Sequence, residues 1–351
     1  MAASKRSVTG GVDTHKHTHQ AAVLDAAGRL LGNAQFPATA AGYAELLTWL
    51  RGFGRVDKVG VEGTGSYGAG LARYLAAKKV RVVEVDRPDR KARRSKGKSD
   101  PIDAIAAAPA ALAGTANGIP KARTGPVEAI RALRVARRGA VKARTAALNQ
   151  LHGLVAAAPE PLRAELTGLP TPALLARCTA YTIDPTHLAD PIEATKAALG
   201  ALTARINALT AEIGIADRRL APIVAAAAPR TCTLFGAGPE VAGQLLTTAG
   251  DNPDRLRSES ALAHLCGAAP IPASSGRTNR HRLNRGGDRH ANHALYTIVL
   301  GRMRHDPRTR AHVARRTTEG RSKKEIIRCL KRYVVREVYT ALLADFAALT
   351  S

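Results

Sequence analysis

The first 86 residues of this 351-residue chain alternate between apolar runs typical of strands and amphipathic segments typical of helices. Strands of this kind are bounded by Gly, Asn and Asp turn signals, and helices repeat apolar residues at spacings of three and four. The predicted strands lie within 8–36, as hairpins, and at 57–62 and 81–86, and the predicted helices lie at 40–53 and 66–79. This order predicts an α/β domain.

The remainder of the chain is predicted to be mainly helical. Two helical stretches carry apolar seams at spacings of three and four, which predict a coiled coil within the chain or between chains. The seam residues are Leu133, Ala136, Ala140, Ala143, Ala147, Leu151 and Leu154 in the first stretch and Leu202, Ile206, Leu209 and Ile213 in the second. Residues 159–190 are richer in proline and predict an irregular linker, and residues 232–351 predict helices again.

Three domains follow from these patterns. We expect an α/β domain at 1–112, a helical coiled-coil connector and oligomerisation region at 113–228, and a mainly α domain at 229–351. The seams predict at least a dimer, because apolar positions at heptad spacing need a partner helix to cover them.

Net charge indicates the class of partner. The chain has 53 Lys and Arg against 28 Asp and Glu, a formal charge of +25. A field of this size attracts polyanions, and nucleic acid is the first candidate. Aromatic residues make up only 3% of the chain, so platforms on which single-stranded bases could stack are sparse.

The compartment is predicted from what the sequence lacks. No run of eighteen apolar residues predicts a membrane helix, and the first residues lack the apolar core of a secretory signal. The four cysteines are widely spaced and suggest neither a metal pair nor a disulfide framework. We therefore expect a cytoplasmic protein without a membrane partner.

Four carboxylates could converge on a metal site. Asp13 lies inside the first predicted strand, Glu62 ends the strand VGVE, and Asp100 and Asp103 share one face at the start of a helix. A carboxylate in a buried strand is costly unless it is paired or binds metal, and oxygen ligands suit Mg²⁺ or Mn²⁺. Each residue also has a simpler interpretation, since an acidic helix start often only complements the helix dipole.

Three histidines follow Asp13 at a period of two. His15, His17 and His19 alternate along the predicted strand, and this alternation predicts that they share a face with Asp13. Three histidines at this period make a poor tetrahedral zinc site, so contacts to a metal ligand or to phosphate are the better interpretation.

Two features of the C-terminal region suggest phosphate binding. Gly236 and Gly238 precede a predicted helix in a pattern typical of a helix-hairpin-helix, although an ordinary turn would also explain it. Ser274 and Ser275 precede Gly276 and a cluster of arginines, namely Arg277, Arg280, Arg282, Arg285 and Arg289. A serine here could attack a phosphorus atom while arginines stabilise the developing charge. The residues alone favour a plain Ser-Gly turn beside a patch that binds nucleic acid, to which Lys98 would also belong.

Three stretches carry a resemblance to a known family: GVDTHKHTHQAAVLD, VGVEGTGSYG and GKSDPIDAIAAA. They resemble the RuvC-like, ribonuclease-H-fold domain of the DEDD transposases in the insertion-sequence family usually called IS-one-ten. The likeness covers nearly the whole chain and departs at Ser99 and Pro101, where Thr and a longer polar residue are expected. It implies that 1–112 is the catalytic domain and 229–351 the transposase domain.

The resemblance also implies residue roles and partners. Asp13, Glu62, Asp100 and Asp103 would form the catalytic, metal-binding tetrad for Mg²⁺ or Mn²⁺, and Ser275, with Ser274 as the second candidate, would be the nucleophile. The reaction would be DNA strand exchange through a transient serine–DNA phosphodiester. Dimers would assemble into a tetramer in which the serine of one protomer meets the tetrad of another, and a bridge RNA would pair with donor and target DNA.

Three other function classes remain open at this point. A RuvC-like Holliday-junction resolvase or metal-dependent nuclease would need the acidic residues but no serine. An actin-like sugar kinase or ATPase could share the first strand pair, although a charge of +25 fits it poorly. A non-enzymatic nucleic-acid-binding protein would show no metal dependence.

Overall fold

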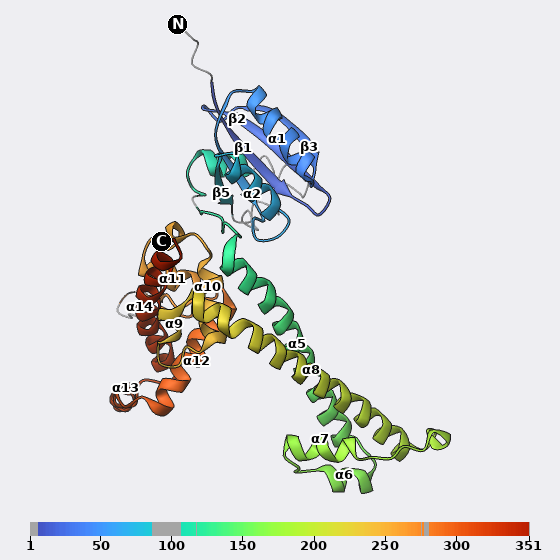
Figure 1. Cartoon of the computed structure of the whole chain (residues 1–351). Coiled ribbons are helices and arrows are strands. Elements are labelled where there is room, and N and C mark those ends of the chain that lie inside the picture. The colour runs from blue at the N-terminus through green and yellow to red at the C-terminus, as the bar shows by residue number, and fades with distance from the viewer. Residues whose placement is uncertain (1–5, 86–106, 117, 275, 277–280, 351) are drawn as a thin grey trace. The chain divides into compact units, whose positions relative to one another are not determined.

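The computed structural model describes residues 6–85, 107–116, 118–274, 276 and 281–350 (Figure 1). The chain divides into two compact units. The first unit comprises 1–128, 246–292 and 328–351, and the second comprises 129–245 and 293–327. Among the described helices, none has both the length and the apolar character that crossing a bilayer requires.

A five-stranded mixed sheet forms the centre of the N-terminal part. Its strands are β1 (Ser7–Thr14), β2 (Thr18–Asp25), β3 (Leu30–Pro37), β4 (Arg55–Glu62) and β5 (Arg81–Val85), in the spatial order β3-β2-β1-β4-β5. The first three strands pair antiparallel, whereas β4 runs parallel to both β1 and β5. The predicted α/β domain is confirmed, and this mixed sheet with helices fits a ribonuclease-H-like fold.

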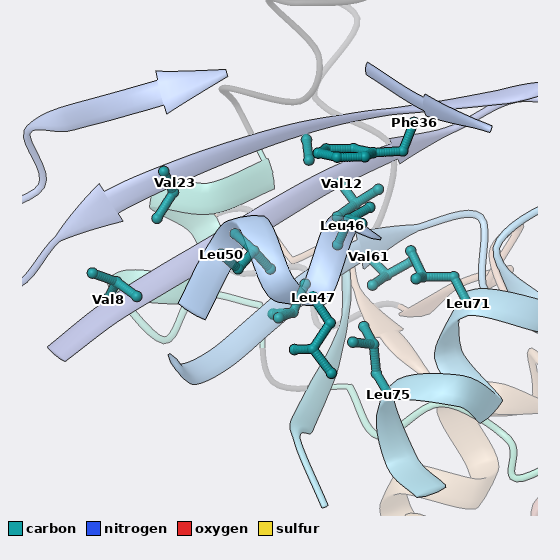
Figure 2. Packing of buried hydrophobic residues seen from close by; sticks show 12 residues of the cluster. Val8, Val12, Val23, Phe36, Leu46, Leu47, Leu50, Val61, Leu71 and Leu75 are labelled. Carbon is teal, nitrogen blue, oxygen red and sulfur yellow. The ribbon is translucent and has the colours of Figure 1, made fainter. Parts of the chain in front are cut away.

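Two helices cover one face of the sheet. They are α1 (Ala40–Gly52) and α2 (Ala69–Ala77), and both lie where the sequence predicted helices. The Thr39 side chain caps α1 by accepting a hydrogen bond from the Gly42 backbone N–H. Leucines from the two helices pack on even-numbered residues of β1, such as Val12 (Figure 2). This packing buries the apolar face of the sheet.

A third helix, residues 107–112, lies against the opposite face of the sheet. Gly11 of β1 and Gly60 of β4 are adjacent in the register, and both lie under this helix. A Cβ atom at Gly11 would lie 2.3 Å from the Ala108 backbone nitrogen, and one at Gly60 would lie 2.9 Å from the Ala107 carbonyl oxygen. Only glycine allows the helix backbone to approach so closely.

Replacing Gly11 with Ala should therefore destabilise the first unit. A methyl group there would collide with backbone atoms, which cannot move away as a flexible side chain could. Overpacking of this kind costs about 1–3 kcal/mol, measured as a lower urea midpoint of unfolding. Gly52→Ala is the control, because a Cβ at Gly52 meets nothing within 4 Å. Equal midpoints for the two variants would contradict the close approach of the helix.

Two long helices dominate the second unit: α5 (Gly125–Ala156), which begins in the first unit, and α8 (Pro191–Ala227). Arg137 of α5 pairs with Asp217 of α8, while Leu151 of α5 packs near Leu199 of α8, so the helices run antiparallel. Five of the eleven predicted seam residues are buried, namely Ala140, Ala147, Leu151, Ile206 and Ile213. A coiled coil, within the chain or between chains, stays a prediction.

The predicted irregular linker is wrong. Residues 159–190 contain α6 (Glu160–Leu166), α7 (Thr171–Thr179) and the short 3-10 helix η1 (Pro185–His187). Their prolines occupy the first positions of these helices, where the missing N–H costs nothing, so they begin helices rather than interrupt them. The two helices bury their leucines against the ends of α5 and α8.

The C-terminal region is mainly helical, as predicted. Its elements are α9 (Pro229–Cys232), α10 (Pro239–Ala249), η2 (Pro253–Arg255), α11 (Glu259–Leu265), α12 (Arg289–His305), α13 (Pro307–Thr318) and α14 (Lys323–Thr350). Gly236 precedes α10 with φ +88°, so a glycine turn does separate α9 from α10. One short antiparallel pair interrupts the helices, β6 (Ile271–Pro272) with β7 (His281–Arg282).

Candidate active site

Asp13 and Glu62 lie at the carboxyl ends of two neighbouring parallel strands. Val12 of β1 pairs with Val61 of β4, so the next position along the register places the two carboxylates side by side. Both side chains are buried, with exposures of 7% and 8%. The Thr14 hydroxyl donates a hydrogen bond of 2.8 Å to the Glu62 carbonyl and fixes the strand ends to each other. Two buried carboxylates held this close suit binding of a cation.

The sheet face on which these carboxylates lie follows from the glycines. Side chains alternate along a strand, so Asp13 shares the face of Gly11, and Glu62 shares that of Gly60. Helix 107–112 packs on both glycines. The acidic pair therefore lies on the face that this helix covers, opposite α1 and α2.

The loop after Glu62 is held at several points. Gly63 has φ +71°, and a Cβ there would lie 2.9 Å from the Thr14 hydroxyl oxygen. The Thr64 hydroxyl donates to the Glu84 carboxylate on β5, and the Arg123 guanidinium donates to the Gly65 carbonyl at 2.7 Å. These contacts fix the chain immediately after the carboxylate. The roles of Thr64, Glu84 and Arg123 are not predictable from the sequence, because no local pattern signals pairing across such separations.

The predicted common face for the three histidines is wrong. Strand β1 ends at Thr14, so His15 and His17 lie in the turn before β2. His19 pairs with Thr14 and faces α1, where its ring stacks on Tyr43 with centroids 5.5 Å apart. Burial there lowers the pKa of His19. Only His15 reaches the acidic pair, with its Nε2 atom 3.1 Å from an Asp13 carboxylate oxygen.

Two of the four predicted metal ligands, Asp13 and Glu62, lie among the described residues. Within the described ranges, no group of three or more His, Cys, Asp or Glu side chains is arranged to hold a metal ion. Asp100 and Asp103, the other two predicted ligands, lie outside the described residues. The described half of the predicted tetrad, Asp13 and Glu62, supplies buried oxygen donors of the kind that Mg²⁺ and Mn²⁺ prefer.

Two short paired strands flank the predicted serine region. Ile271 of β6 pairs with Arg282 of β7, and Pro272 pairs with His281. We call these two strands the serine hairpin, because the predicted serines lie between them in the sequence. Ser274 is exposed. Four predicted residues of the serine and nucleic-acid site lie outside the described residues: Ser275, Arg277, Arg280 and Lys98.

Three of the predicted arginines are described. Arg282 lies in β7, Arg285 lies in the turn that follows, and Arg289 begins α12. All three are exposed. Because these arginines next to the serine hairpin are exposed, a phosphate can reach their side chains without any rearrangement of the fold.

A partly buried hydrogen-bond network holds together the segments on either side of this hairpin. Gly287 has φ +81°, and a Cβ there would lie 2.6 Å from the Leu265 carbonyl oxygen. The Asn292 amide donates to the carbonyls of Cys266 and Gly267 at 2.9 and 3.0 Å. The Lys331 ammonium in turn donates to the Asn292 side-chain oxygen at 2.8 Å.

Lys331 belongs to this network, although no sequence pattern predicts it. It is a buried cation on α14, and burial lowers its pKa. It lies 39 residues after its partner Asn292, and no sequence pattern signals a contact at that separation. Burying an ammonium group is costly, and the hydrogen bond from Lys331 to the Asn292 side chain offsets part of this cost. Lys331 thereby holds Asn292 in the position from which it contacts Cys266 and Gly267.

The buried thiol beside the hairpin is not suited to act as a nucleophile. Burial raises the pKa of Cys266 to about 12, and the charge of Asp288 acts in the same direction. A thiol with this pKa stays protonated near neutral pH and is unreactive. Among the described cysteines none is in a disulfide, and burial also raises the pKa of Cys178.

Comparison with protein families now identifies the chain. Residues 10–158 match the IS110 model of DEDD transposases, whose description is "Transposase", and residues 228–314 match the model "Transposase IS116/IS110/IS902 family". Comparison with curated proteins gives no match. The first match includes the strands that carry Asp13 and Glu62, and the second includes the serine hairpin. The chain therefore belongs to the IS110 (IS-one-ten) family of DEDD transposases.

Proposed function

We propose that this transposase exchanges DNA strands by transesterification at a site built from a serine and an acidic tetrad. Ser275 is the nucleophile, and Asp13, Glu62, Asp100 and Asp103 hold a divalent cation, Mg²⁺ or Mn²⁺. The observation that carries the proposal is the burial of two adjacent carboxylates on the sheet face under helix 107–112.

The position of that helix supports convergence of the tetrad. Its first described residue, Ala107, lies four residues after Asp103 in the sequence, and four residues of chain span at most about 14 Å. The helix backbone contacts Gly11 and Gly60, each two residues before one of the described carboxylates. The segment that follows Asp103 in the sequence therefore packs, from Ala107 on, against the face that holds Asp13 and Glu62.

The chemistry conserves phosphodiester bonds. The Ser275 oxygen attacks a DNA phosphorus, so a serine–phosphate bond forms, one P–O bond to the DNA breaks, and the released DNA hydroxyl takes the proton. A hydroxyl of the incoming strand then attacks the same phosphorus and restores the serine. No external energy source is needed, because each bond broken is replaced. When bound, a divalent cation supplies positive charge that stabilises the phosphate in the transition state.

The tetrameric assembly and the guide RNA are proposed because the family resemblance implies them. In a tetramer built from dimers, the serine of one protomer would meet the tetrad of another, and a bridge RNA would pair with donor and target DNA. Leu202 and Leu209 of α8 are only half-buried within one chain, which supports a role for this seam between copies. Recognition by base pairing suits a protein that needs only to hold a heteroduplex by its shape.

Reconstitution tests the function. Purified protein, donor and target DNA and a transcript of the non-coding DNA that flanks the gene should give recombinant joints in Mg²⁺. EDTA should stop the reaction, and excess Mg²⁺ or Mn²⁺ should restore it. Hydrolytic cleavage without joints would favour the resolvase or nuclease, and binding without any metal-dependent reaction would favour the non-enzymatic protein.

A further inference from the structure

Helix α13 contributes almost nothing to a hydrophobic core. Of its twelve residues, only Thr309 is buried. By contrast, the shorter helix α7 buries Leu174 and Cys178. Helices of about twelve residues are marginal in water when no packed face stabilises them, so α13 must be held in another way.

Local signals hold α13 and its connection to α14. Asp306 caps the start of α13 by accepting a hydrogen bond from the Thr309 N–H at 3.0 Å, and Gly320, with φ +76°, ends it. Ser322 and Glu325 then form a reciprocal cap at the start of α14, with the Ser322 N–H donating to the Glu325 carboxylate at 3.0 Å. Such capping stabilises the helix ends without burying apolar surface.

The same segment is strongly basic. Residues 306–324 contain seven Lys or Arg and two acidic residues. Both acids are already engaged, since Asp306 is the cap and Glu319 pairs with Arg315 and Arg316. The remaining five cations are exposed and make no ion pair within the described part of the chain: Arg308, Arg310, Arg321, Lys323 and Lys324.

We propose that residues 306–324, the basic hairpin, bind the phosphate backbone of double-stranded DNA outside the catalytic site. The inference rests on the proposed function, because DNA is the substrate. A helix that buries almost none of its side chains and displays cations without acidic partners is stabilised when a polyanion binds to it. The hairpin contains no Phe, Tyr or Trp on which an unpaired base could stack, so its chemistry fits a duplex backbone rather than single-stranded bases.

The contacts expected here position DNA without reading its sequence. Arg308 and Arg310 lie in the first turn of α13, and Arg321 follows the end of the helix, so exposed cations stand at both ends of α13. Phosphate contacts from such side chains set the affinity and its salt dependence, whereas sequence is read elsewhere.

A charge-matched pair of variants tests the proposal in the full chain. The hairpin variant carries Arg308→Gln, Arg310→Gln and Lys324→Gln, and Gln keeps a good helix propensity. The control carries Arg51→Gln, Arg73→Gln and Arg205→Gln, which remove the same charge from exposed positions on other helices. Binding to random-sequence duplex DNA is measured over a range of salt concentrations, with circular dichroism to verify helix content.

The hairpin variant should lose at least about tenfold in affinity relative to the control. Its plot of log K against log salt should flatten by about 2 to 3, since each phosphate contact contributes about 0.9 to the slope. At saturating protein, the amount of serine–DNA adduct should match the wild type. This separates the proposal from the function on which it rests, because adduct formation tests the function independently.

Two results would overturn the proposal. Equal affinity and salt slope for hairpin and control variants would show that the hairpin makes no phosphate contacts. A loss confined to duplex RNA, with duplex DNA binding unchanged, would assign the surface to RNA. If the wild type bound no DNA and formed no adduct, the proposed function itself would fail together with this inference.

Discussion

Asp13→Asn or Glu62→Gln is expected to reduce strand exchange by about a thousandfold or more while DNA affinity changes little. Loss of a cation ligand removes several kcal/mol of transition-state stabilisation, and each 1.4 kcal/mol corresponds to about tenfold in rate. Affinity comes mainly from the basic surface, which these changes leave intact. Recombinant joints are counted in Mg²⁺, and duplex binding is measured on the same preparations.

A third buried carboxylate in the same sheet, that of Asp25, provides the control. Asp25 pairs with Val8 at the opposite end of β1, where it accepts hydrogen bonds from the backbone N–H groups of Ala27 and Arg29. The hydrogen bond from Arg29 is the main cause that holds the pKa of Asp25 at about 2. Asp25→Asn should lower stability but leave the exchange rate of the folded protein intact. Normal exchange by Asp13→Asn would refute the assignment of the acidic pair.

The lowered pKa of Asp25 also predicts how the stability of the fold changes with pH. Its folded pKa lies below that of the unfolded chain, so the unfolded state binds more protons as pH falls from about 4 to 2. The stabilisation that Asp25 contributes is present above pH 4 and is lost across this window. The Asp25→Asn variant should therefore lose less stability than the wild type on acidification.

Ser275→Ala should abolish strand exchange and still bind DNA. A serine hydroxyl is a poor nucleophile at neutral pH and needs activation, and His281, the nearest histidine in the sequence, is a weak candidate for the base. We therefore expect the acidic site to activate the serine hydroxyl. In the proposed assembly this acidic site belongs to another protomer. Denaturing gels of the wild type on nicked DNA should show a protein–DNA adduct that is absent with Ser275→Ala.

Mixing inactive proteins tests the composite site. Ser275→Ala and Asp13→Ala proteins, each inert alone, should regain part of the activity together, because mixed assemblies can build one intact site. An adduct that survives in Ser275→Ala but disappears in Ser274→Ala would identify the other serine as the nucleophile. Cleavage without any adduct in the double serine variant would support hydrolysis by a resolvase.

Local patterns determined most of the secondary structure. The strand ending at Glu62 and the helices α1, α2 and α5 were predictable because apolar periodicity within one segment reflects its own packing. Asp13 and Glu62 stood out for the same reason, as carboxylates in segments that should be buried. The family was also recognisable from short motifs, since the resemblance is confirmed by matches to both parts of the chain.

Local patterns failed where the answer depended on where a strand stops or how a segment packs. A period of two grouped His19 with Asp13, but a turn at residues 15–17 ends β1 and sends His19 to the other face, against Tyr43. Prolines in 159–190 indicated a linker, yet packing against α5 and α8 stabilises helices that begin at those prolines.

Tertiary structure alone determined the surroundings of the site. The contact between Gly11 and Ala108 joins residues 97 positions apart, and Lys331 supports the serine hairpin through Asn292. Neither residue type nor local spacing carries information about such distant partners, because each contact exists only after the sheet and helices have packed. The sequence by itself therefore determined the elements and the candidate chemistry of this transposase, whereas packing decided which face of the sheet holds the acidic pair and what braces the serine hairpin.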